Sequence, residues 1–448
     1  MDYTLIHYRV QEWEQRAYHH VSRLLASQGW PTEGLEFDPD LVIRGLVIDT
    51  ELGNIVKANR FGYVKRAYHG TTPLPFDELR KVYGRVIVDL AEPRWRFMNT
   101  LFSLSEAVLY MQLVDLIDQG KVPFAASFEQ TYQTVRRTVD QAHIEGELKG
   151  EILANPERFV EREREVALAL LDQLHAGKQL LLITNSEWSY TSAIMTYAID
   201  PYLPKGTTWR DLFKLIIVEA RKPAFFIAHN PLFEVRSEQG DLRPARGGMK
   251  KGGIYLGGNA SQVEAALSLS GDEILYVGDH IFSDLHVTKN VQRWRTALVL
   301  RELENEVRAI RDFEDQQVAI DALMSKKDAL ELQAVQLRTA LQRIDKGYGP
   351  QQGDVAALKA EQDRLKQAIM ELDSEIAPLA RASGQSGSEV WGLLMRAGND
   401  KSHLARQIER YADIYMARVS DLAAHTPFAY LRSSRGSLPH DPGAGLGF

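Results

Sequence analysis

Two aspartates, five positions apart, follow an apolar run in the second half of the chain. Asp279 and Asp284 belong to the stretch Gly278–Asp284, which comes directly after the apolar residues 274–277. Such a run predicts a buried strand, and an open α/β sheet binds its ligands at the carboxyl ends of its strands. Two carboxylates there can converge on one hard cation, and the glycine leaves room for close approach. The plainer alternative is a helix N-terminus that carries aspartates.

Three further segments place polar residues in comparable positions. Thr184–Ser186 follow the apolar residues 180–183, Lys222 comes soon after the apolar residues 215–218, and Asp2 lies at the start of the sequence. Each has a plainer explanation alone: a helix N-cap for the threonine, a solvated surface charge for the lysine, and a disordered terminus for the aspartate. Their order behind apolar strands favours one shared site at the carboxyl edge of a parallel sheet.

This order of motifs resembles that of the haloacid dehalogenase-like (HAD) phosphohydrolases, which have Asp, then Thr-Asn-Ser, then Lys, then Gly-Asp-x4-Asp. Longer stretches narrow the resemblance to the cytosolic purine 5'-nucleotidases. They are residues 43–50 with Gly53 and Asn54, and residues 185–191, 220–223, 278–282 and 407–413. The resemblance runs from Met1 to about His440 and implies an α/β fold. Its expected parts are a Rossmann-like parallel-sheet HAD core, an inserted mainly helical cap and a C-terminal helical hairpin.

The family's first motif is Asp-Met-Asp-Tyr-Thr-Leu, and this sequence begins at the Met between the two aspartates. The family's nucleophile is the first of these aspartates, so the resemblance places it and most of its strand before Met1. Two explanations compete: a natural protein that starts further upstream, or a truncated chain that cannot perform the first chemical step. We expect the former, because the other catalytic motifs are intact and a lost central strand would remove much of the core.

The resemblance also implies a role for each motif residue in hydrolysis through an aspartyl-phosphate. Asp2 is the general acid that protonates the departing 5'-oxygen and then the base that activates water. The Asp2 carbonyl and the Asp279 carboxylate are Mg²⁺ ligands, and Asp284 holds the waters or partners of the metal. Lys222 neutralises the charge of the phosphate. Further contacts to the phosphate are implied for Thr184, Asn185, Ser186 and Arg221.

The expected cap carries the residues that the resemblance assigns to the purine. Arg136 and Asp140 are four positions apart, so they share one face of a helix and can read the O6 and N1 edge of hypoxanthine or guanine. Phe102 is expected to stack on the base. Further polar contacts are implied for His143 and Lys149. The alternative is a surface ion pair and a core phenylalanine. The family usually has an aromatic residue where this chain has Ile144, so we expect stacking to rest on Phe102 alone.

Animal members of the family have a second site for adenine nucleotides that activate them. Four residues match parts of that site: Asn99, Phe282, Gln407 and Arg410. The basic residue expected upstream of Asn99 is Asp89 in this chain, which counts against activation by ATP.

Composition excludes several other classes of protein. The 448 residues are 44% hydrophobic and 25% charged, as in ordinary globular proteins. A net charge of -7 gives no basic surface for a nucleic acid polymer. The absence of cysteine excludes disulfides and thiol catalysis. No long apolar run predicts a membrane span, and the first residues are not a signal peptide, so we expect a cytoplasmic protein.

The order of apolar and helical stretches predicts how the chain is divided. Strands expected at 180–183, 215–218, 274–277 and 296–300 alternate with helices, which indicates a parallel sheet with helices on both faces. The predicted parts are the first core segment 1–89, the cap 90–165, the second core segment 166–314, a hairpin 315–380 and a C-terminal segment 381–448 that packs on the core.

Heptad seams predict the antiparallel helical hairpin. Apolar residues recur every seven positions from Leu323 to Ile344, and a second set runs from Leu358 to Leu379. Residues 346–350 contain Gly and Pro and break the helix between the two sets. The hairpin is either a protruding packing element or an oligomerisation arm, and we expect a homo-oligomer.

The function that these residues favour is a 5'-nucleotidase for purine nucleoside monophosphates, IMP and GMP. Transfer of the phosphate to a nucleoside is a second activity that a covalent intermediate allows. Two alternatives stay open: a catalytically dead nucleotide-binding protein that builds an assembly, and a phosphatase for another small phosphate ester. In the last case Arg136 and Asp140 would read nothing.

Overall fold

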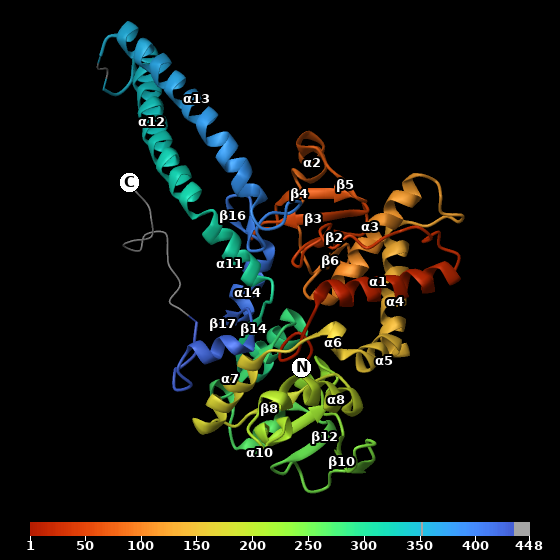
Figure 1. Cartoon of the computed structure of the whole chain (residues 1–448). Helices are drawn as coiled ribbons and strands as arrows, with labels where there is room; N and C mark the ends of the chain where they lie inside the picture. The colour runs from red at the N-terminus through yellow and green to blue at the C-terminus, as the bar shows by residue number, and fades with distance from the viewer. Residues whose placement is uncertain (351–352, 434–448) are drawn as a thin grey trace. The chain divides into compact units, whose positions relative to one another are not determined.

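The computed structural model describes residues 1–350 and 353–433, without the side chains of residues 143–145. The chain forms two compact units. One contains residues Met1–Leu303 and the chain from Met395 onward, and the other contains Glu304–Leu394. Figure 1 shows parallel sheets with helices in the first unit and a long helical hairpin in the second. The predicted α/β fold class is confirmed.

The first core sheet combines three parallel strands with an antiparallel hairpin. Its spatial order is β11 (Leu242–Pro244), β10 (Leu232–Val235), β12 (Gly253–Gly257), β9 (Leu215–Val218) and β8 (Leu181–Ile183). All four residues of β9 are buried, as expected for an apolar strand with both faces covered. The carboxyl ends of β8 and β9 lead into the Thr-Asn-Ser and Lys motifs.

A second parallel sheet contains β13 (Leu275–Gly278), β14 (Arg295–Val299) and β17 (Ile414–Met416). Because β17 pairs with β14, the C-terminal segment completes the core around Ala297, Val299 and Met416. Among the described residues, β8 and β13 each form the outer strand of their sheet. A cavity of about 700 Å³ is lined by both strands and by Met1.

Helices cover the two core sheets within this unit. They are α7 (Arg164–His175), α8 (Trp188–Ile199), α9 (Ala224–Ile227), α10 (Ala260–Leu267) and α14 (His403–Tyr411). The residues that follow β13 form two short segments of π-helix, Ile281–His286 and Thr288–Gln292. A two-stranded antiparallel sheet joins β1 (His7–Tyr8) to β7 (Val160–Glu161), so the first residues of the chain are held against the end of the cap.

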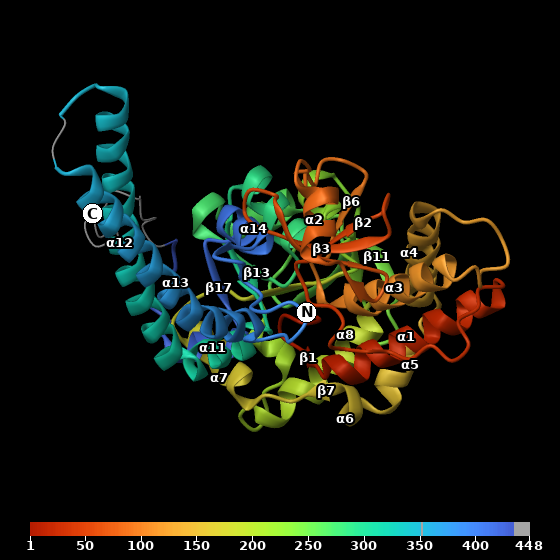
Figure 2. The ribbon, with the colours of Figure 1, turned by 90° about the horizontal axis from the view of Figure 1, so that it is seen from above.

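The cap is mainly helical, and it includes a helix at residues 10–27 that the prediction placed in the first core segment 1–89. Its helices are α1 (Val10–Ser27), α3 (Leu104–Asp118), α4 (Phe128–Glu145), α5 (Glu147–Ala154) and α6 (Pro156–Phe159), and Figure 2 shows α1, α3 and α4 side by side. A capping box between Ser127 and Gln130 starts α4, and Gly146 ends it in the left-handed conformation (φ 73°).

Residues 47–97 form an antiparallel sheet that sequence patterns did not reveal. Its spatial order is β5 (Thr72–Pro73), β4 (Val64–His69), β3 (Asn54–Ala58), β2 (Val47–Asp49) and β6 (Trp95–Phe97), with α2 (Phe76–Tyr83) beside it. The predicted boundary after residue 89 lies before β6, although β6 pairs with β2. Asp49 is buried in this sheet and accepts hydrogen bonds from Arg94 and Tyr83.

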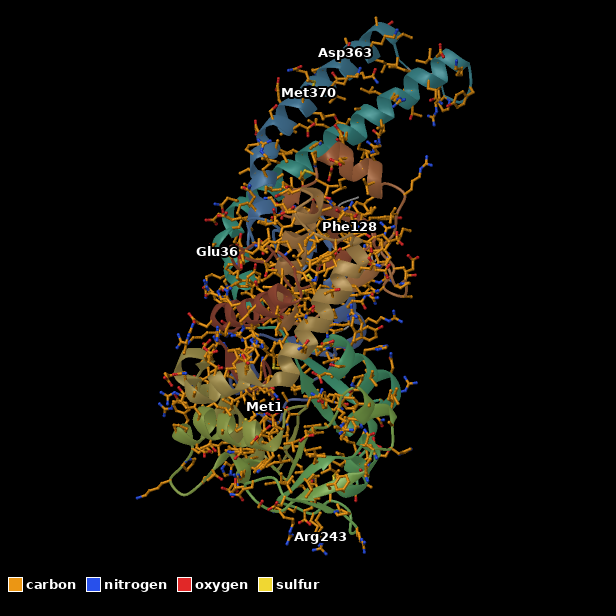
Figure 3. The ribbon with its side chains drawn as sticks, turned by 90° about the vertical axis from the view of Figure 1, so that its right-hand side faces the viewer. Met1, Glu36, Phe128, Arg243, Asp363 and Met370 are labelled. Carbon is orange, nitrogen blue, oxygen red and sulfur yellow. The ribbon has the colours of Figure 1, made fainter. Side chains whose placement is uncertain are left out.

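The second unit is the expected helical hairpin. It contains most of α11 (Leu303–Asp312) with α12 (Glu314–Lys346) and α13 (Val355–Gln385), which pack along each other. An ion pair of 2.5 Å joins Lys327 to Asp373 across the two long helices. Figure 3 shows Asp363 and Met370 on α13, where Met370 is 63% exposed. Within the described residues, no helix is both long and apolar enough to cross a membrane.

Candidate functional site

A tight turn at the start of the chain holds Asp2. The carbonyl of Met1 accepts hydrogen bonds from the main-chain nitrogens of Thr4, Leu5 and Ile6 at 2.9–3.2 Å. Tyr3 adopts a positive φ of 51° in this turn, which is unusual for a bulky residue. The turn directs the Asp2 carboxylate toward the loop after β8, where the Ser186 hydroxyl donates to Asp2 Oδ2 at 2.7 Å. Asp2 is therefore ordered by side-chain contacts.

The loops after β8 and β9 are joined by paired hydrogen bonds. The side-chain oxygen of Asn185 accepts from the main-chain nitrogen of Lys222 at 2.7 Å, and its amide donates to the Lys222 carbonyl at 3.2 Å. Thr184 is buried, and its hydroxyl accepts from the Ser186 nitrogen at 3.1 Å. The Thr-Asn-Ser motif thus fixes the lysine loop. Arg221, in the same loop, is exposed.

Lys222 and Asp284 form a buried ion pair between the two core sheets. The ammonium lies 2.8 Å from Asp284 Oδ1 and donates to the Tyr276 hydroxyl at 3.1 Å. Burial alone would lower the pKa of Lys222, but the Asp284 carboxylate raises it overall. Burial would likewise raise the pKa of Asp284, but Lys222 holds it below its ordinary value. Both groups are therefore charged at neutral pH.

Gly278 was predicted to leave room for the close approach of a cation. The glycine does leave room, but a side chain occupies it. A Cβ atom built there would lie 2.6 Å from Asp284 Oδ2. The room that this glycine leaves is therefore taken by Asp284, whose Oδ2 also accepts from the His280 nitrogen at 3.2 Å. The helical turn that follows is capped by the His280 side chain rather than by either aspartate.

The residues assigned to Mg²⁺ by resemblance fit a sparse oxygen site. The Thr4 hydroxyl lies 3.4 Å from the carbonyl of Asp2 and 2.8 Å from Asp279 Oδ1, so the two oxygens flank one side chain. Burial and the neighbouring Asp284 raise the pKa of Asp279, a carboxyl that a cation would help to ionise. In the described part of the chain, no three His, Cys, Asp or Glu side chains form a metal cluster. One carbonyl and one carboxylate suit Mg²⁺, which keeps several waters.

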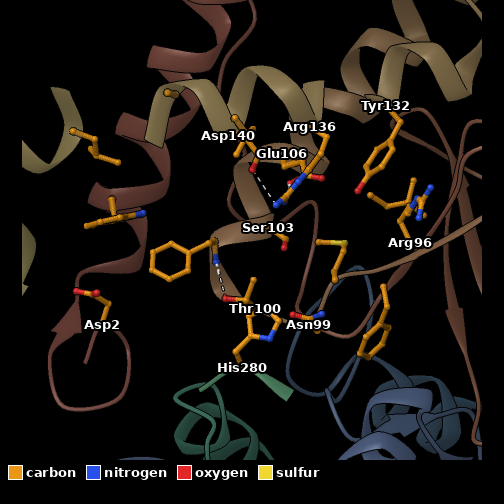
Figure 4. Close-up of a pocket in the computed structure, with 18 of the residues that line it drawn as sticks. Asp2, Arg96, Asn99, Thr100, Ser103, Glu106, Tyr132, Arg136, Asp140 and His280 are labelled. Carbon is orange, nitrogen blue, oxygen red and sulfur yellow. Dashed lines mark hydrogen bonds and ion pairs between the residues drawn. The ribbon is translucent and has the colours of Figure 1, made fainter. Parts of the chain in front are cut away.

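A cavity of about 480 Å³ lies between the loops that carry these motif residues and the cap. Asp2 and His280 line it from the core side, and Arg136, Asp140 and Lys149 line it from the cap. Figure 4 shows Asp2, Arg136 and His280 facing this space from different elements. The volume lies in the range of small-molecule sites. The structure therefore brings Asp2, one of the predicted catalytic residues, to the same pocket as the predicted base-reading residues, whereas Lys222 and Thr184 are not part of its lining.

Arg136 occupies the centre of a charged cluster on α4. Its guanidinium contacts Asp140 at 3.0 Å and Glu106 at 2.8 Å. Figure 4 shows these three side chains pointing toward one another. Glu106 is 3% exposed, whereas Arg136 and Asp140 are about half exposed. Burial alone would lower the pKa of Arg136, but the two carboxylates raise it. Glu106 was not predicted from the sequence: it lies in α3, directly after the short 3-10 turn Leu101–Ser103 that contains Phe102.

Lys149 and Phe102 border the same cavity through different contacts. The Lys149 ammonium pairs with Glu187 at 2.7 Å and lies 5.1 Å from the centre of the Tyr190 ring. Phe102 packs edge-on against Tyr3, with ring centres 4.7 Å apart. Both residues line the pocket, as expected for contacts to a base. The side chain of His143, the remaining predicted base contact, lies outside the described residues.

The residues that match the family's effector site fall into two places. Phe282 packs near Tyr411 at 6.3 Å, and the Arg410 guanidinium lies 5.2 Å from the Tyr411 ring. Gln407 is buried and contacts the His403 ring at 3.0 Å. Asn99 instead lines the cavity shared with Asp2. Binding of an effector there stays a prediction.

Two buried tyrosines and one buried arginine support the site without having been singled out by sequence. The Tyr8 hydroxyl donates to Asp2 Oδ1 and lies 2.9 Å from the Tyr190 hydroxyl. Arg44, from the resembling stretch 43–50, donates to the carbonyl of Asp279. These contacts join residues up to 235 positions apart, and no local pattern reports them.

Comparison with known proteins relates the sequence to one family. The sequence model described as "5' nucleotidase family" matches residues 1–443. A 5'-nucleotidase domain-containing protein of Dictyostelium discoideum is 24% identical over 98% of this chain and 71% of its own length. The human 5'-nucleotidase domain-containing protein 2 is 28% identical over 86% of this chain and 70% of its own, and the rat protein of that name is 27% identical over 91% and 70%. The chain belongs to the 5' nucleotidase family.

Proposed function

We propose that the protein hydrolyses purine nucleoside 5'-monophosphates, with IMP and GMP as preferred substrates and Mg²⁺ as cofactor. The observation that carries the proposal is the single cavity that has Asp2 on one side and the Arg136–Asp140 pair on the other. A nucleotide in this cavity would have its phosphate beside Asp2 and its base beside α4. Membership of the 5' nucleotidase family supports hydrolysis of nucleotides in general.

The proposed chemistry has two steps with one covalent intermediate. An aspartate that precedes Met1 attacks phosphorus, the bond from phosphorus to the 5'-oxygen breaks, and Asp2 gives a proton to that oxygen. Asp2 then accepts a proton from water, which attacks phosphorus and releases the aspartate. Lys222 compensates the negative charge of the phosphoryl oxygens. The Asp2 carbonyl and Asp279 would hold Mg²⁺, which supplies positive charge to the same oxygens. A nucleoside hydroxyl in place of water would give phosphotransfer.

The cavity between β8 and β13 supports a position for the strand that would carry the nucleophile. β8 and β13 carry the second and last motifs, and the cavity of about 700 Å³ is lined by both strands. A parallel strand inserted there would pair with both and would end near Asp2, because Met1 also lines this cavity. We propose that residues preceding Met1 fill this cavity in the active enzyme.

Two forms of the protein test the proposal. The form that starts at Met1 should not convert IMP above the background of Mg²⁺ alone, because its remaining groups only bind and polarise. A form extended by the residues encoded directly upstream should hydrolyse IMP and GMP. In that form Asp2→Asn should lower kcat by roughly 10²–10⁴-fold, the usual share of a general acid and base. Full turnover by the form that starts at Met1 would refute the covalent route.

A matched substitution separates catalysis from folding in the extended form. Asp400 is a partly exposed aspartate that pairs with Arg60 at 3.0 Å in the same unit and does not line the cavity. Asp400→Asn should keep the activity of the parent enzyme, because it leaves the cavity lining unchanged and removes only one partly exposed ion pair. If Asp400→Asn and Asp2→Asn reduce kcat alike, the loss at Asp2 reflects folding, and its assignment as acid and base fails.

A further inference from the structure

Each carboxylate oxygen of Asp2 accepts a hydrogen bond from a different kind of hydroxyl group, a phenol at one oxygen and a serine hydroxyl at the other. Tyr8 donates to Oδ1 and Ser186 donates to Oδ2 at 2.7 Å. The family resemblance implies a contact between Ser186 and the phosphate, and it implies no role for Tyr8. An aspartate that must transfer a proton needs one oxygen available to the leaving group. Each oxygen has two lone pairs, so a hydroxyl partner does not block it, but an oxygen that turns toward the leaving group loses the alignment of that contact.

Tyr8 belongs to a directed chain of hydrogen bonds. A phenol has one proton, and that of Tyr8 goes to the Asp2 carboxylate. The contact of 2.9 Å between Tyr8 and Tyr190 must then be a bond that Tyr190 donates. Tyr190 orients Tyr8, and Tyr8 orients Asp2.

The backbone and the surrounding aromatic rings hold the Tyr8 side chain in place beside Asp2. Tyr8 lies in β1 and pairs with Val160 of β7. Its side chain is 2% exposed, and its ring centre lies 4.5 Å from that of Trp13. A buried hydroxyl that loses its partner costs about 1–3 kcal/mol. Tyr8 is also absent from the residues that line the substrate cavity, so it acts through Asp2 rather than on a ligand.

Ser186 is the partner that can change. Its hydroxyl has one proton, which can go to Asp2 or to a phosphoryl oxygen, and a serine hydroxyl turns freely about its own bond. The Ser186 nitrogen is held by Thr184 at 3.1 Å, so this rotation leaves the loop in place. A bound phosphate would attract the Ser186 proton and so free Asp2 Oδ2.

We propose that Tyr8 is a positioning residue that keeps Asp2 Oδ1 fixed, while substrate phosphate draws Ser186 away and leaves Oδ2, which carries the proton that Asp2 accepted from water in the preceding turnover, to protonate the departing oxygen. This inference rests on the nucleotidase function proposed above. No proton leaves either tyrosine during the cycle. The bond that breaks is that from Ser186 to Asp2, and the bond that forms is that from Ser186 to the phosphate.

Leaving groups of different basicity test this inference. The assay measures kcat/KM of the extended enzyme, since this ratio reports the steps up to departure of the leaving group. IMP releases a sugar alkoxide that needs a proton, whereas p-nitrophenyl phosphate releases a phenolate that does not. Tyr8→Phe should lower kcat/KM for IMP by roughly 10–100-fold, since a displaced catalytic group costs about 10²-fold. It should lower the value for p-nitrophenyl phosphate by less than about threefold.

Three companion variants keep the result decisive. Tyr190→Phe retains the donor of Tyr8 and should give a smaller loss with the same selectivity for IMP. Ser186→Ala should slow both esters by similar factors, because its contact to phosphate is common to both. Tyr18→Phe is the matched control: this tyrosine is fully buried on α1, donates to Gln112 and lies outside the cavity lining, so neither ester should be affected.

Equal loss with both esters in Tyr8→Phe and Tyr190→Phe would overturn the inference, because it would show a structural role alone. The proposed function would still stand in that case, since the parent enzyme would still hydrolyse IMP. Failure of the parent enzyme on both esters would instead refute the proposed function, and the role of Tyr8 with it. The two failures are therefore distinguishable in the same set of assays.

Discussion

Asp140→Ala tests base recognition with little disturbance of the fold. Asp140 and Arg136 are 54% and 49% exposed, and a pair of this kind stabilises a protein by only about 0.2–1 kcal/mol. After the substitution Arg136 keeps its contact of 2.8 Å with the buried Glu106. The arginine should therefore stay in place, and any change in specificity should report the Asp140 carboxylate itself.

The expected size of the effect follows from one charge-assisted hydrogen bond. Such a bond contributes about 1.5–3 kcal/mol, which corresponds to roughly 10–150-fold in kcat/KM. A carboxylate can accept from the N1–H of hypoxanthine, whereas N1 of adenine carries no proton. Asp140→Ala in the extended enzyme should thus reduce the preference for IMP over AMP by about this factor, and it should change the rate with ribose 5-phosphate far less.

The assay compares kcat/KM for IMP, AMP and ribose 5-phosphate in parent and variant. Glu129→Ala supplies a control on the same helix, because Glu129 is exposed and its side chain bonds only its helix neighbour Gln133 among the contacts described. This control should keep all three rates. Equal loss with the three substrates in Asp140→Ala would show that Asp140 supports the cap and reads no base, which would refute the reasoning.

Other parts of the site give three further expectations. Asp279→Asn should weaken Mg²⁺ binding sharply, because a hard cation prefers a charged oxygen; unchanged activity at low Mg²⁺ would leave Asp279 with a structural role. Phe102→Ala should raise the KM for IMP but keep the preference for IMP over AMP. A changed preference would show that the Phe102 ring determines specificity. Burial raises the pKa of Glu14 from 4.5 to about 7 and lowers that of His7 from 6.5 to about 4. Glu14 therefore contributes stability below pH 4.5 that is lost as pH rises through 7, and His7 contributes stability above pH 6.5 that is lost as pH falls through 4. Relative to the parent, the melting temperature of Glu14→Gln should rise from pH 4 to 6.5 and that of His7→Gln should fall from pH 4.5 to 7. Parallel differences for the two variants would contradict both assignments.

The parallel core could be predicted because its strands are apolar and short. The run 215–218 is β9 to the residue, and the run 274–277 differs from β13 by one position. The long helices were equally accessible, since a heptad seam repeats over more than four turns. The structure has them as α12 and α13. In these segments local composition and tertiary environment favour the same structure.

The sheet of residues 47–97 escaped prediction for a physical reason. Its strands mix buried charged and polar residues with apolar ones: Lys57 and Asn54 are buried in β3, and Asp49 is buried in β2. A buried charge is tolerated there only because Arg94 and Tyr83 satisfy it from outside the strand. Alternation of apolar and polar residues, the usual signal of an antiparallel strand, is therefore absent.

Parts of the candidate site could not be predicted from the sequence, for a different reason. Motif order placed Lys222 and Asp284 together, and the structure has them in contact. Tyr8, by contrast, meets Tyr190 across 182 positions. Tyr190 belongs to the resembling stretch 185–191, but nothing in the sequence around either tyrosine indicates that their hydroxyls meet. Support for a catalytic group comes from whichever side chain the fold brings behind it. Only a structure reports that kind of contact.

The pairing of β17 with β14 affects how the protein is made. β14 ends at Val299, but its partner strand begins at Ile414, so the helical hairpin is synthesised between them. At about 5–20 residues per second, β14 waits roughly 6–23 s on the ribosome with one edge unpaired. An exposed parallel edge is a template for aggregation. Nascent chains stalled before residue 414 should therefore bind holdase chaperones more than chains stalled beyond residue 433, and equal capture of both would contradict this view.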